Sequence, residues 1–361
     1  MSHVNPHVLP HFDPSKGLEI GIYSLGEWLP NPHTGKRIPA SQRIQEIVEM
    51  AVYAEEAGLD IFQLGESHQK HFLAQAHMTI LAAIAQATHR IKLSSGATII
   101  STSDPVRVFE DAATIDLLSK GRMEIVAGRA SRVGLFELLG YNLADYEALF
   151  EEKFALLLEI NENERVTWEG KFRAPLHKAE VLPRPENDTG GLPIWRALGG
   201  SMESAAKAGT MGVPIYQAHL GGAAEVYGHR IQLFRDMAEA NGYDSKHIPV
   251  STSGFLYARE DTLEAYRAYY PHINESMKLT NGQGFNKRAF AQGQDMRSII
   301  NVGDPQLIID KILYQHELYN HQRYTAQIDF GGVPLDEIKR TIDILGEQIV
   351  PEVKKYTARK D

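Results

Sequence analysis

Residues 104–128 read DPVRVFEDAATIDLLSKGRMEIVAG, and this stretch holds the unit from which the fold is built. Its first part, residues 106–119, has the apolar spacing of an amphipathic helix, and residues 123–127 form a short apolar run typical of a buried strand. Gly121 lies between them, at the left-handed position where helices commonly end. A helix followed at once by a buried strand is the repeating unit of a parallel α/β sheet.

The same alternation continues from one end of the chain to the other. Eight runs have the composition of buried strands: residues 18–24, 60–64, 91–95, 123–127, 193–198, 213–217, 250–257 and 324–330. Helical periodicity lies between them, as at residues 41–57, 106–119, 146–160 and 333–353. Eight βα units favour a closed barrel, because an open sheet of that width is less common. The sequence therefore predicts an α/β protein of the (β/α)8 TIM-barrel class.

The continuous alternation predicts a single domain over residues 1–361, a length that is common for α/β barrels. Two segments interrupt it. Residues 165–185, after the fourth strand, are β-rich around a central turn. Residues 276–303, after the seventh strand, are polar, contain glycine and have weak periodicity. Connections of that length are often functional lids, so 276–303 is the candidate mobile lid.

Composition limits the classes of partner. The formal charge of −9 and the pI of about 5.9 argue against a large basic surface for nucleic acid, although they leave phosphate pockets open. No apolar run approaches the length of a membrane span, and the first 17 residues lack the apolar core of a secretory signal. We expect a cytoplasmic protein that binds neither nucleic acid nor membrane.

The chain has no cysteine, so it forms no disulfide, thiolate nucleophile or cysteine-ligated metal centre. Any redox chemistry then requires a bound cofactor.

A protonatable cluster follows the second predicted strand, where barrel active sites lie. Glu66, His68 and His71 suit a metal site in residue type, but a helical HxxxH arrangement is absent, so a hydrogen-bonded loop is the favoured explanation. Histidine both donates and accepts near neutral pH. We therefore predict Glu66 and His68 as the catalytic residues, with no metal site.

Small residues follow the third predicted strand. Gly96, Ala97 and Thr98 leave room for a flat cofactor ring to approach the backbone, or they mark a β-bulge. Both readings stay open. All three are candidate cofactor-binding residues.

Gly128 and Arg129 follow the fourth strand, and Arg132 lies three residues further on. A guanidinium group can pair with a phosphate through two hydrogen bonds. Arg129, which is closest to the strand, is the better candidate, because a surface ion pair explains Arg132 equally well.

After the fifth strand the chain reads LGGSMESAA, residues 198–206, which is a glycine turn followed by a helix start. Ser201 fits the N-cap and Ser204 the third helical position. Exposed N–H groups and the positive helix end make such a turn an anion site, and two glycines exceed what a simple cap requires. Gly199, Gly200, Ser201 and Ser204 are therefore candidate phosphate ligands.

Taken together, these residues resemble the luciferase-like monooxygenase family of flavin-dependent barrels. The similarity runs almost end to end. Its most specific parts are DPVR at 104–107, TIDLLSKGR at 114–122, GR at 128–129 and LGGSMESAA at 198–206, in the order and spacing of the family.

The resemblance implies that reduced FMN binds across the barrel mouth as a co-substrate, reacts with O2 and supports oxygen insertion into a small organic substrate. It also implies a flavin reductase as the diffusional source of reduced FMN, and a homodimer. Gly96 and Ala97 would match the pair that lies against the isoalloxazine ring. The phosphate pocket would be formed by Arg129, Gly200, Ser201 and Ser204, and the lid by residues 276–303.

One departure separates the chain from many members. They carry Glu-His-His where this chain has Glu66-Ser67-His68, which speaks against luciferase-type aldehyde chemistry but not against flavin binding. Three rival functions remain: deazaflavin-dependent hydride transfer on the same fold, a metal-dependent hydrolase or isomerase, and a non-catalytic flavin-binding protein.

Overall fold

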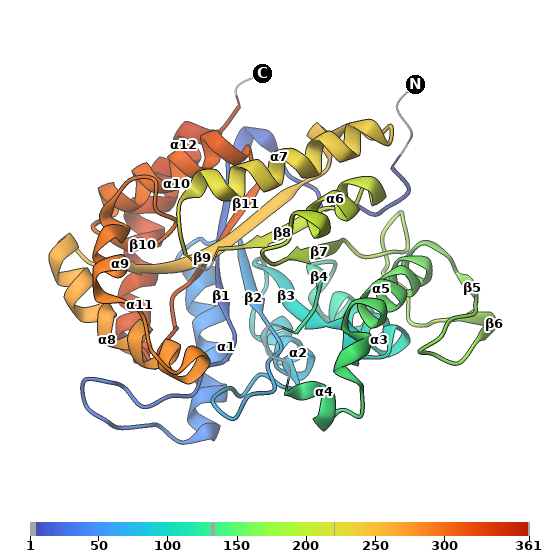
Figure 1. The fold of residues 1–361 in the computed structure, drawn as a ribbon, viewed down its shortest axis with the longest axis horizontal. Coiled ribbons are helices and arrows are strands. Elements are labelled where there is room, and N and C mark those ends of the chain that lie inside the picture. The colour runs from blue at the N-terminus through green and yellow to red at the C-terminus, as the bar shows by residue number, and fades with distance from the viewer. Residues whose placement is uncertain (1–4, 131–133, 220, 360–361) are drawn as a thin grey trace.

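The computed structural model describes residues 5–130, 134–219 and 221–359. Its centre is a closed barrel of eight parallel strands (Figure 1). In order around the barrel they are β1 (Glu19–Ser24), β2 (Ile61–Leu64), β3 (Lys92–Ile99), β4 (Met123–Gly128), β7 (Ile194–Leu198), β8 (Ile215–Ala218), β9 (Val250–Ala258) and β11 (Arg323–Gln327). Pairing of β11 with β1, in which Tyr324 lies opposite Ile20, closes the ring.

All eight predicted strands and the TIM-barrel fold are confirmed. The strands were recognisable because both faces of each are covered, one by the barrel interior and one by the helices, so that β4 and β9 are buried at every position. The largest deviation is in β3, which continues to Ile99, beyond the predicted end at residue 95.

The predicted helices over 41–57, 106–119 and 146–160 correspond to α1 (Ala40–Glu56), α3 (Pro105–Ser119) and α5 (Tyr146–Glu162). Asp104 caps α3 by accepting a hydrogen bond from the N–H of Val106. Further crossover helices are α2 (His77–Ala87), α6 (Met202–Met211), α7 (Ala224–Ala240) and α10 (Pro305–Tyr319), and the main apolar core lies between this outer layer and the barrel.

The continuous helix predicted over 333–353 is wrong in detail. α11 (Leu335–Ile344) begins two residues later, a π-helical turn covers Leu345–Ile349, and α12 (Val350–Thr357) follows. The insertion at 165–185 is confirmed as β-rich: β5 (Arg165–Trp168) and β6 (Leu176–Glu180) form an antiparallel hairpin that stands away from the barrel (Figure 1).

The segment 276–303 is not one continuous loop, which corrects its predicted boundaries. Its first residues belong to α8 (Thr262–Asn281), and its last form β10 (Asn301–Gly303), which pairs with β9. Between them, residues 282–300 hold α9 (Lys287–Ala291) and a 3-10 turn. The weak periodicity of the sequence reflects these short elements. We refer to residues 282–300 as the lid candidate.

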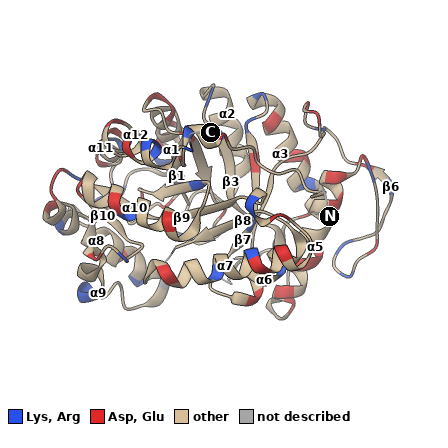
Figure 2. Cartoon of the chain, turned by 90° about the horizontal axis from the view of Figure 1, so that it is seen from above, with Lys and Arg blue, Asp and Glu red and all other residues tan. Residues whose placement is uncertain are grey.

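Acidic and basic residues are intermixed along the outer helices (Figure 2). Within the described ranges, no helix has both the length and the apolar character that a membrane span needs.

Candidate functional site

A layer of small residues lies at the carboxyl ends of neighbouring barrel strands. Large side chains fill the interior below it, and these are Val126, Trp195 and Tyr216. Residues two positions apart on a strand point to the same face. The next inward residue on each of these strands is small: Gly128, Ala197 and Ala218.

Ala97 of β3 completes this layer. A Cβ atom added to Gly128 would lie 2.8 Å from the Cβ of Ala97 and 3.4 Å from that of Ala197, so the three residues are in contact distance of one another. Ala97, Ala197 and Ala218 are partly exposed although they belong to a closed barrel sheet. The barrel is therefore open above them. We call Ala97, Gly128, Ala197 and Ala218 the small-residue layer.

β3 carries a bulge where the sequence places its small residues. The strand register shifts between Gly96 and Thr98, and the peptide bond between Gly96 and Ala97 is cis. The bulge is confirmed, and it brings Ala97 into the small-residue layer. Thr98 is buried and its Oγ1 lies 2.8 Å from Nε2 of His77.

The glycine turn after β7 is open and ends in a capped helix. Ser201 is the N-cap of α6, and its Oγ accepts a hydrogen bond from the N–H of Ser204 at 3.3 Å, as predicted. Gly199 and Gly200 are exposed, and a Cβ atom added to either would meet no atom within 4 Å. Neither has a positive φ. Neither packing nor backbone conformation therefore requires glycine at these two positions, and the space beside the turn is open.

Two side chains donate hydrogen bonds to the carbonyl groups of this turn. Nε2 of Gln217, on β8, donates to the carbonyl of Gly199 at 3.2 Å. Nη2 of Arg230, on α7, donates to the carbonyl of Gly200 at 2.9 Å, and its Nη1 donates to Oε1 of Gln217 at 3.2 Å. Sequence reasoning missed both residues, since α6 separates Gln217 from the turn, and α6, β8 and the first part of α7 separate Arg230 from it.

Arg129 is held by carboxylates of α5. Its Nη1 lies 3.1 Å from Glu147 and its Nη2 lies 3.5 Å from Glu151. Burial would raise the pKa of Glu151, but its hydrogen bond with Arg196 and the positive charges of Arg196, Lys207 and Arg129 lower it. Lys207 also pairs with Glu203 in the first turn of α6, which links this cluster to the glycine turn. Arg132 lies outside the described residues.

Glu66 and His68 form a pair at the end of β2. Nε2 of His68 lies 2.6 Å from Oε1 of Glu66, and the N–H of Ile99 donates to the other carboxylate oxygen at 2.7 Å. Within the described part of the chain, Nδ1 of His68 makes no hydrogen bond. A histidine whose one nitrogen is held by a carboxylate presents the other as a donor or acceptor.

His77 joins this pair from the start of α2. Its Nδ1 lies 4.0 Å from Glu66, and burial lowers its pKa although the charge of Glu66 acts in the opposite direction. Sequence reasoning missed His77, because no spacing rule connects it with Glu66 across the intervening loop.

His71 follows His68 in the same loop. It borders a small depression with Ser276 and Leu279 of α8. In the ranges that the structure describes, no three His, Asp or Glu side chains are grouped so as to hold a metal ion.

His219 follows β8 and is buried between the rings of Tyr227 and Tyr319, with centroid distances of 4.3 and 5.4 Å. Burial lowers the pKa of His219 to about 3, and the positive charge of Arg230 acts in the same direction. This histidine is therefore neutral at physiological pH.

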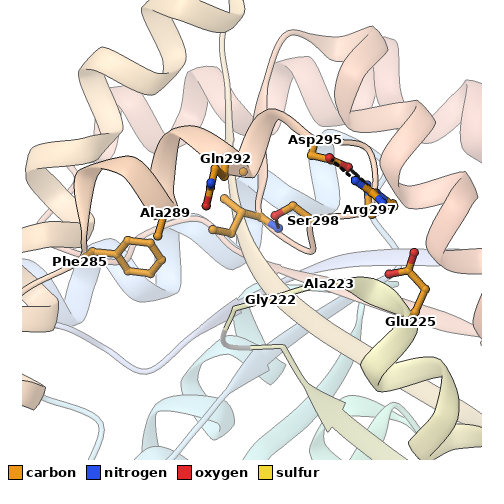
Figure 3. Close-up of a pocket in the computed structure, with 11 residues that line it drawn as sticks. Gly222, Ala223, Glu225, Phe285, Ala289, Gln292, Asp295, Arg297 and Ser298 are labelled. Atoms are coloured by element: carbon orange, nitrogen blue, oxygen red, sulfur yellow. Dashed lines mark hydrogen bonds and ion pairs between the residues drawn. The ribbon is translucent and has the colours of Figure 1, made fainter.

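A cavity of about 820 Å³ opens between the connection after β8 and the lid candidate (Figure 3). Gly222 and Ala223 line one side, and Ala223 forms an isolated antiparallel bridge with Ser298. Phe285 and Ala289 line the other side, with the ion pair of Asp295 and Arg297 at 2.8 Å near one end.

These features fit a flavin carrying a phosphate. The small-residue layer leaves space for a flat ring over the barrel. The open turn at the start of α6 offers N–H groups and a positive helix end to an anion. Gly199 directly follows the last residue of β7 and lies two residues after Ala197, so the small-residue layer and the turn adjoin each other.

Comparisons with known proteins agree with this description. A family model described as luciferase-like monooxygenase matches residues 18–322. The alkanal monooxygenase alpha chain of Photorhabdus luminescens is 24% identical over 335 residues, covering 86% of this chain and 91% of the relative. The oxygenase component of flavin-dependent trigonelline monooxygenase from Acinetobacter baylyi is 21% identical over 334 residues, covering 86% and 90%.

Solved structures share the fold. Monooxygenase RslO1 from Streptomyces bottropensis superposes with a TM-score of 0.79 at 22% identity. The oxygenating constituent of 3,6-diketocamphane monooxygenase from Pseudomonas putida, in complex with FMN, gives 0.74 at 14%. The coenzyme F420 dependent tetrahydromethanopterin reductase from Methanopyrus kandleri gives 0.71 at 16%. Each match covers 93% of this chain and 99% of the other. At these identities the likeness concerns the fold alone.

Proposed function

The chain belongs to the luciferase-like monooxygenase family, an assignment that makes it an oxygen-incorporating enzyme, and from that premise we propose that it uses reduced FMN and O2 to oxygenate a small organic substrate. Two adjoining features carry the proposal. The small-residue layer is open to the barrel mouth, and the glycine turn that suits an anion follows β7 directly. A flavin mononucleotide has the matching parts, a flat ring and a terminal phosphate.

The phosphate is assigned to Gly199, Gly200, Ser201 and Ser204. The start of α6 supplies N–H groups without helical partners together with the positive end of the helix dipole. Arg129 is the assigned cationic ligand, exchanging part of its pairing with Glu147 for the phosphate. Gly96, Ala97 and Gly128 are assigned to the ring, because Ala97 and Gly128 belong to the small-residue layer and Gly96 precedes Ala97 in the bulge of β3.

Flavin supplies the reaction with oxygen, and the protein residues bind, orient and exclude water. His68 is assigned as the hydrogen-bonding group that faces the reacting oxygen or the substrate through Nδ1, with Glu66 holding Nε2. Ser67 stands where many relatives place a histidine, so His68 is the remaining imidazole of that motif. The organic substrate is assigned to the cavity beneath the lid candidate, whose walls combine Phe285 and Ala289 with the charged pair of Asp295 and Arg297.

A flavin reductase is the proposed partner that supplies reduced FMN by diffusion. The name of the trigonelline enzyme, an oxygenase component, supports a division of labour between two proteins. We also propose a homodimer and closure of residues 282–300 over the bound flavin.

Deazaflavin-dependent hydride transfer is the second candidate, favoured by the fold shared with the F420 dependent reductase. Anaerobic fluorescence titration with reduced FMN, reduced FAD and reduced F420 separates the two. Preferential binding of FMN followed by oxygen-dependent product formation supports the proposal. Tight binding of F420 with weak binding of FMN would overturn it in favour of hydride transfer.

A further inference from the structure

Arg230 differs from every other fully buried arginine of the described chain. Five arginines fall in the buried class: Arg43, Arg196, Arg230, Arg259 and Arg323. Four of them pair with carboxylates, which are Asp329, Glu151, Glu337 and the two acids Glu19 and Glu124. Arg230 is 6% exposed and has no carboxylate partner among the described residues. Its hydrogen bonds go to the carbonyl of Gly200 and the side-chain oxygen of Gln217.

A guanidinium group stays charged in proteins, and burying a charge without a counter-charge is costly. Arg230 lies over the ring of Tyr227, 5.3 Å from its centroid, but among the described residues no negative charge pairs with it. The group lies beneath the start of α6, which is the positive end of that helix. His219 beside it is neutral. In the described residues, Nε of Arg230 also lacks a hydrogen-bond partner although it is buried.

Arg235, on the same helix, also forms hydrogen bonds to carbonyl groups, but its surroundings stabilise its charge. Its Nη2 donates to the carbonyl of Asn320 at 3.1 Å and also to that of Tyr319, both at the end of α10. The end of a helix carries partial negative charge, and Arg235 is partly exposed. Arg230 has neither advantage.

We propose that Arg230 is the buried counter-charge of the flavin phosphate and that, with Gln217, it positions the turn that binds it. This inference rests on the proposed function and names the residues that make the site select a phosphorylated flavin. They act from below the turn, without direct contact with the ligand.

Peptide geometry explains how the two residues orient the turn. In a trans peptide unit the C=O and the following N–H point in opposite directions. Gln217 holds the carbonyl of Gly199 downward, which turns the N–H of Gly200 outward. Arg230 holds the carbonyl of Gly200 in the same way, which turns the N–H of Ser201 outward. The same contacts place a full positive charge beneath these two donors.

The test compares the affinities of the full-length protein for FMN and for riboflavin, which lacks the phosphate, by anaerobic titration of the reduced flavins. The wild type is expected to prefer FMN. Arg230→Met should lower that preference roughly 10- to 100-fold, because removing one partner of a buried charge pair costs on the order of 2 kcal/mol or more. Arg230→Lys should restore part of it, and Gln217→Leu should lower it less because the charge remains.

Arg235→Met is the matched control and should leave the ratio of the two affinities unchanged. Inorganic phosphate should raise the melting temperature of the wild type and of Arg235→Met more than that of Arg230→Met. Arg230→Met could fail to fold without ligand. If FMN and riboflavin then restore folding equally well, the result counts against the proposal. If neither restores it, the affinity ratios of Gln217→Leu and Arg230→Lys decide. An unchanged ratio in those variants overturns this inference. A wild type that binds both flavins equally, or neither, overturns the proposed function instead.

Discussion

The Nε2 atom of His68 lies 2.6 Å from the carboxylate of Glu66, and the same carboxylate accepts the N–H of Ile99 at the end of β3. The carboxylate thus connects the ends of two neighbouring strands to one imidazole ring. This arrangement fixes the ring at the end of β2, and Nδ1 makes no hydrogen bond within the described residues. Substitution of His68 therefore tests whether the residue is catalytic or only structural.

His68→Gln should keep the fold and the affinity for FMN but slow product formation about 100- to 10,000-fold, the range typical of general acid-base groups. Stopped-flow absorbance of flavin reoxidation, together with product analysis, measures the effect. His71→Gln is the matched control, because His71 lies in the same loop and lines a depression with Ser276 and Leu279 of α8. Wild-type rates in His68→Gln would make His68 a structural residue held by Glu66.

Gly200→Asp should weaken FMN binding about 10-fold or more, through repulsion between the new carboxylate and the phosphate. The fold should tolerate it, because a Cβ atom at residue 200 meets nothing within 4 Å. Riboflavin is the control ligand, and its affinity should change much less. If FMN binds the variant as tightly as the wild type, the phosphate lies elsewhere.

Lys311 should make stability rise with pH. It is fully buried, its ammonium group donates to the carbonyls of Gly293 and Ile300, and burial lowers its pKa from 10.5 to about 8 although Asp295 acts in the opposite direction. Between about pH 8 and 10.5 the unfolded chain then holds a proton that the folded chain has lost. The free energy of unfolding therefore rises with pH across that window, by up to about 3 kcal/mol.

Urea unfolding of the wild type and Lys311→Met at pH 8 and near pH 10 measures this contribution. Burial also lowers the pKa of Lys153 to about 8, so the informative quantity is the difference between the two proteins, which cancels the shared contribution of Lys153. The difference should grow in favour of the wild type as pH rises. A difference that is constant with pH would show that Lys311 keeps an ordinary pKa.

Limited proteolysis should cut residues 282–300 before the barrel, and bound FMN should slow that cleavage, if this segment closes over the flavin. Lys311→Met should speed cleavage, because Lys311 holds the segment at Gly293 and Ile300. Mass spectrometry of the fragments locates the cuts. Cleavage confined to the chain termini, with or without FMN, would contradict a mobile lid.

Local patterns were sufficient to predict the turn at 199–204 and the bulge at 96–98. The serine cap and paired glycines are features of consecutive residues, and so is the run of small residues in β3. The same reasoning placed the lid boundaries wrongly, because short elements such as α9 and β10 have too few residues to show a period.

Sequence alone determined the barrel, because strands buried on both faces and amphipathic crossover helices repeat a pattern that has few stable packings. It also predicted the capped glycine turn after β7 and the bulge in β3. Tertiary structure decided which side chains meet there: His77 beside Glu66, Gln217 and Arg230 beneath Gly200, and Lys311 beneath the lid candidate. The physical reason is that these contacts join residues far apart in the chain, and the burial and charge that define their roles arise only when the barrel closes.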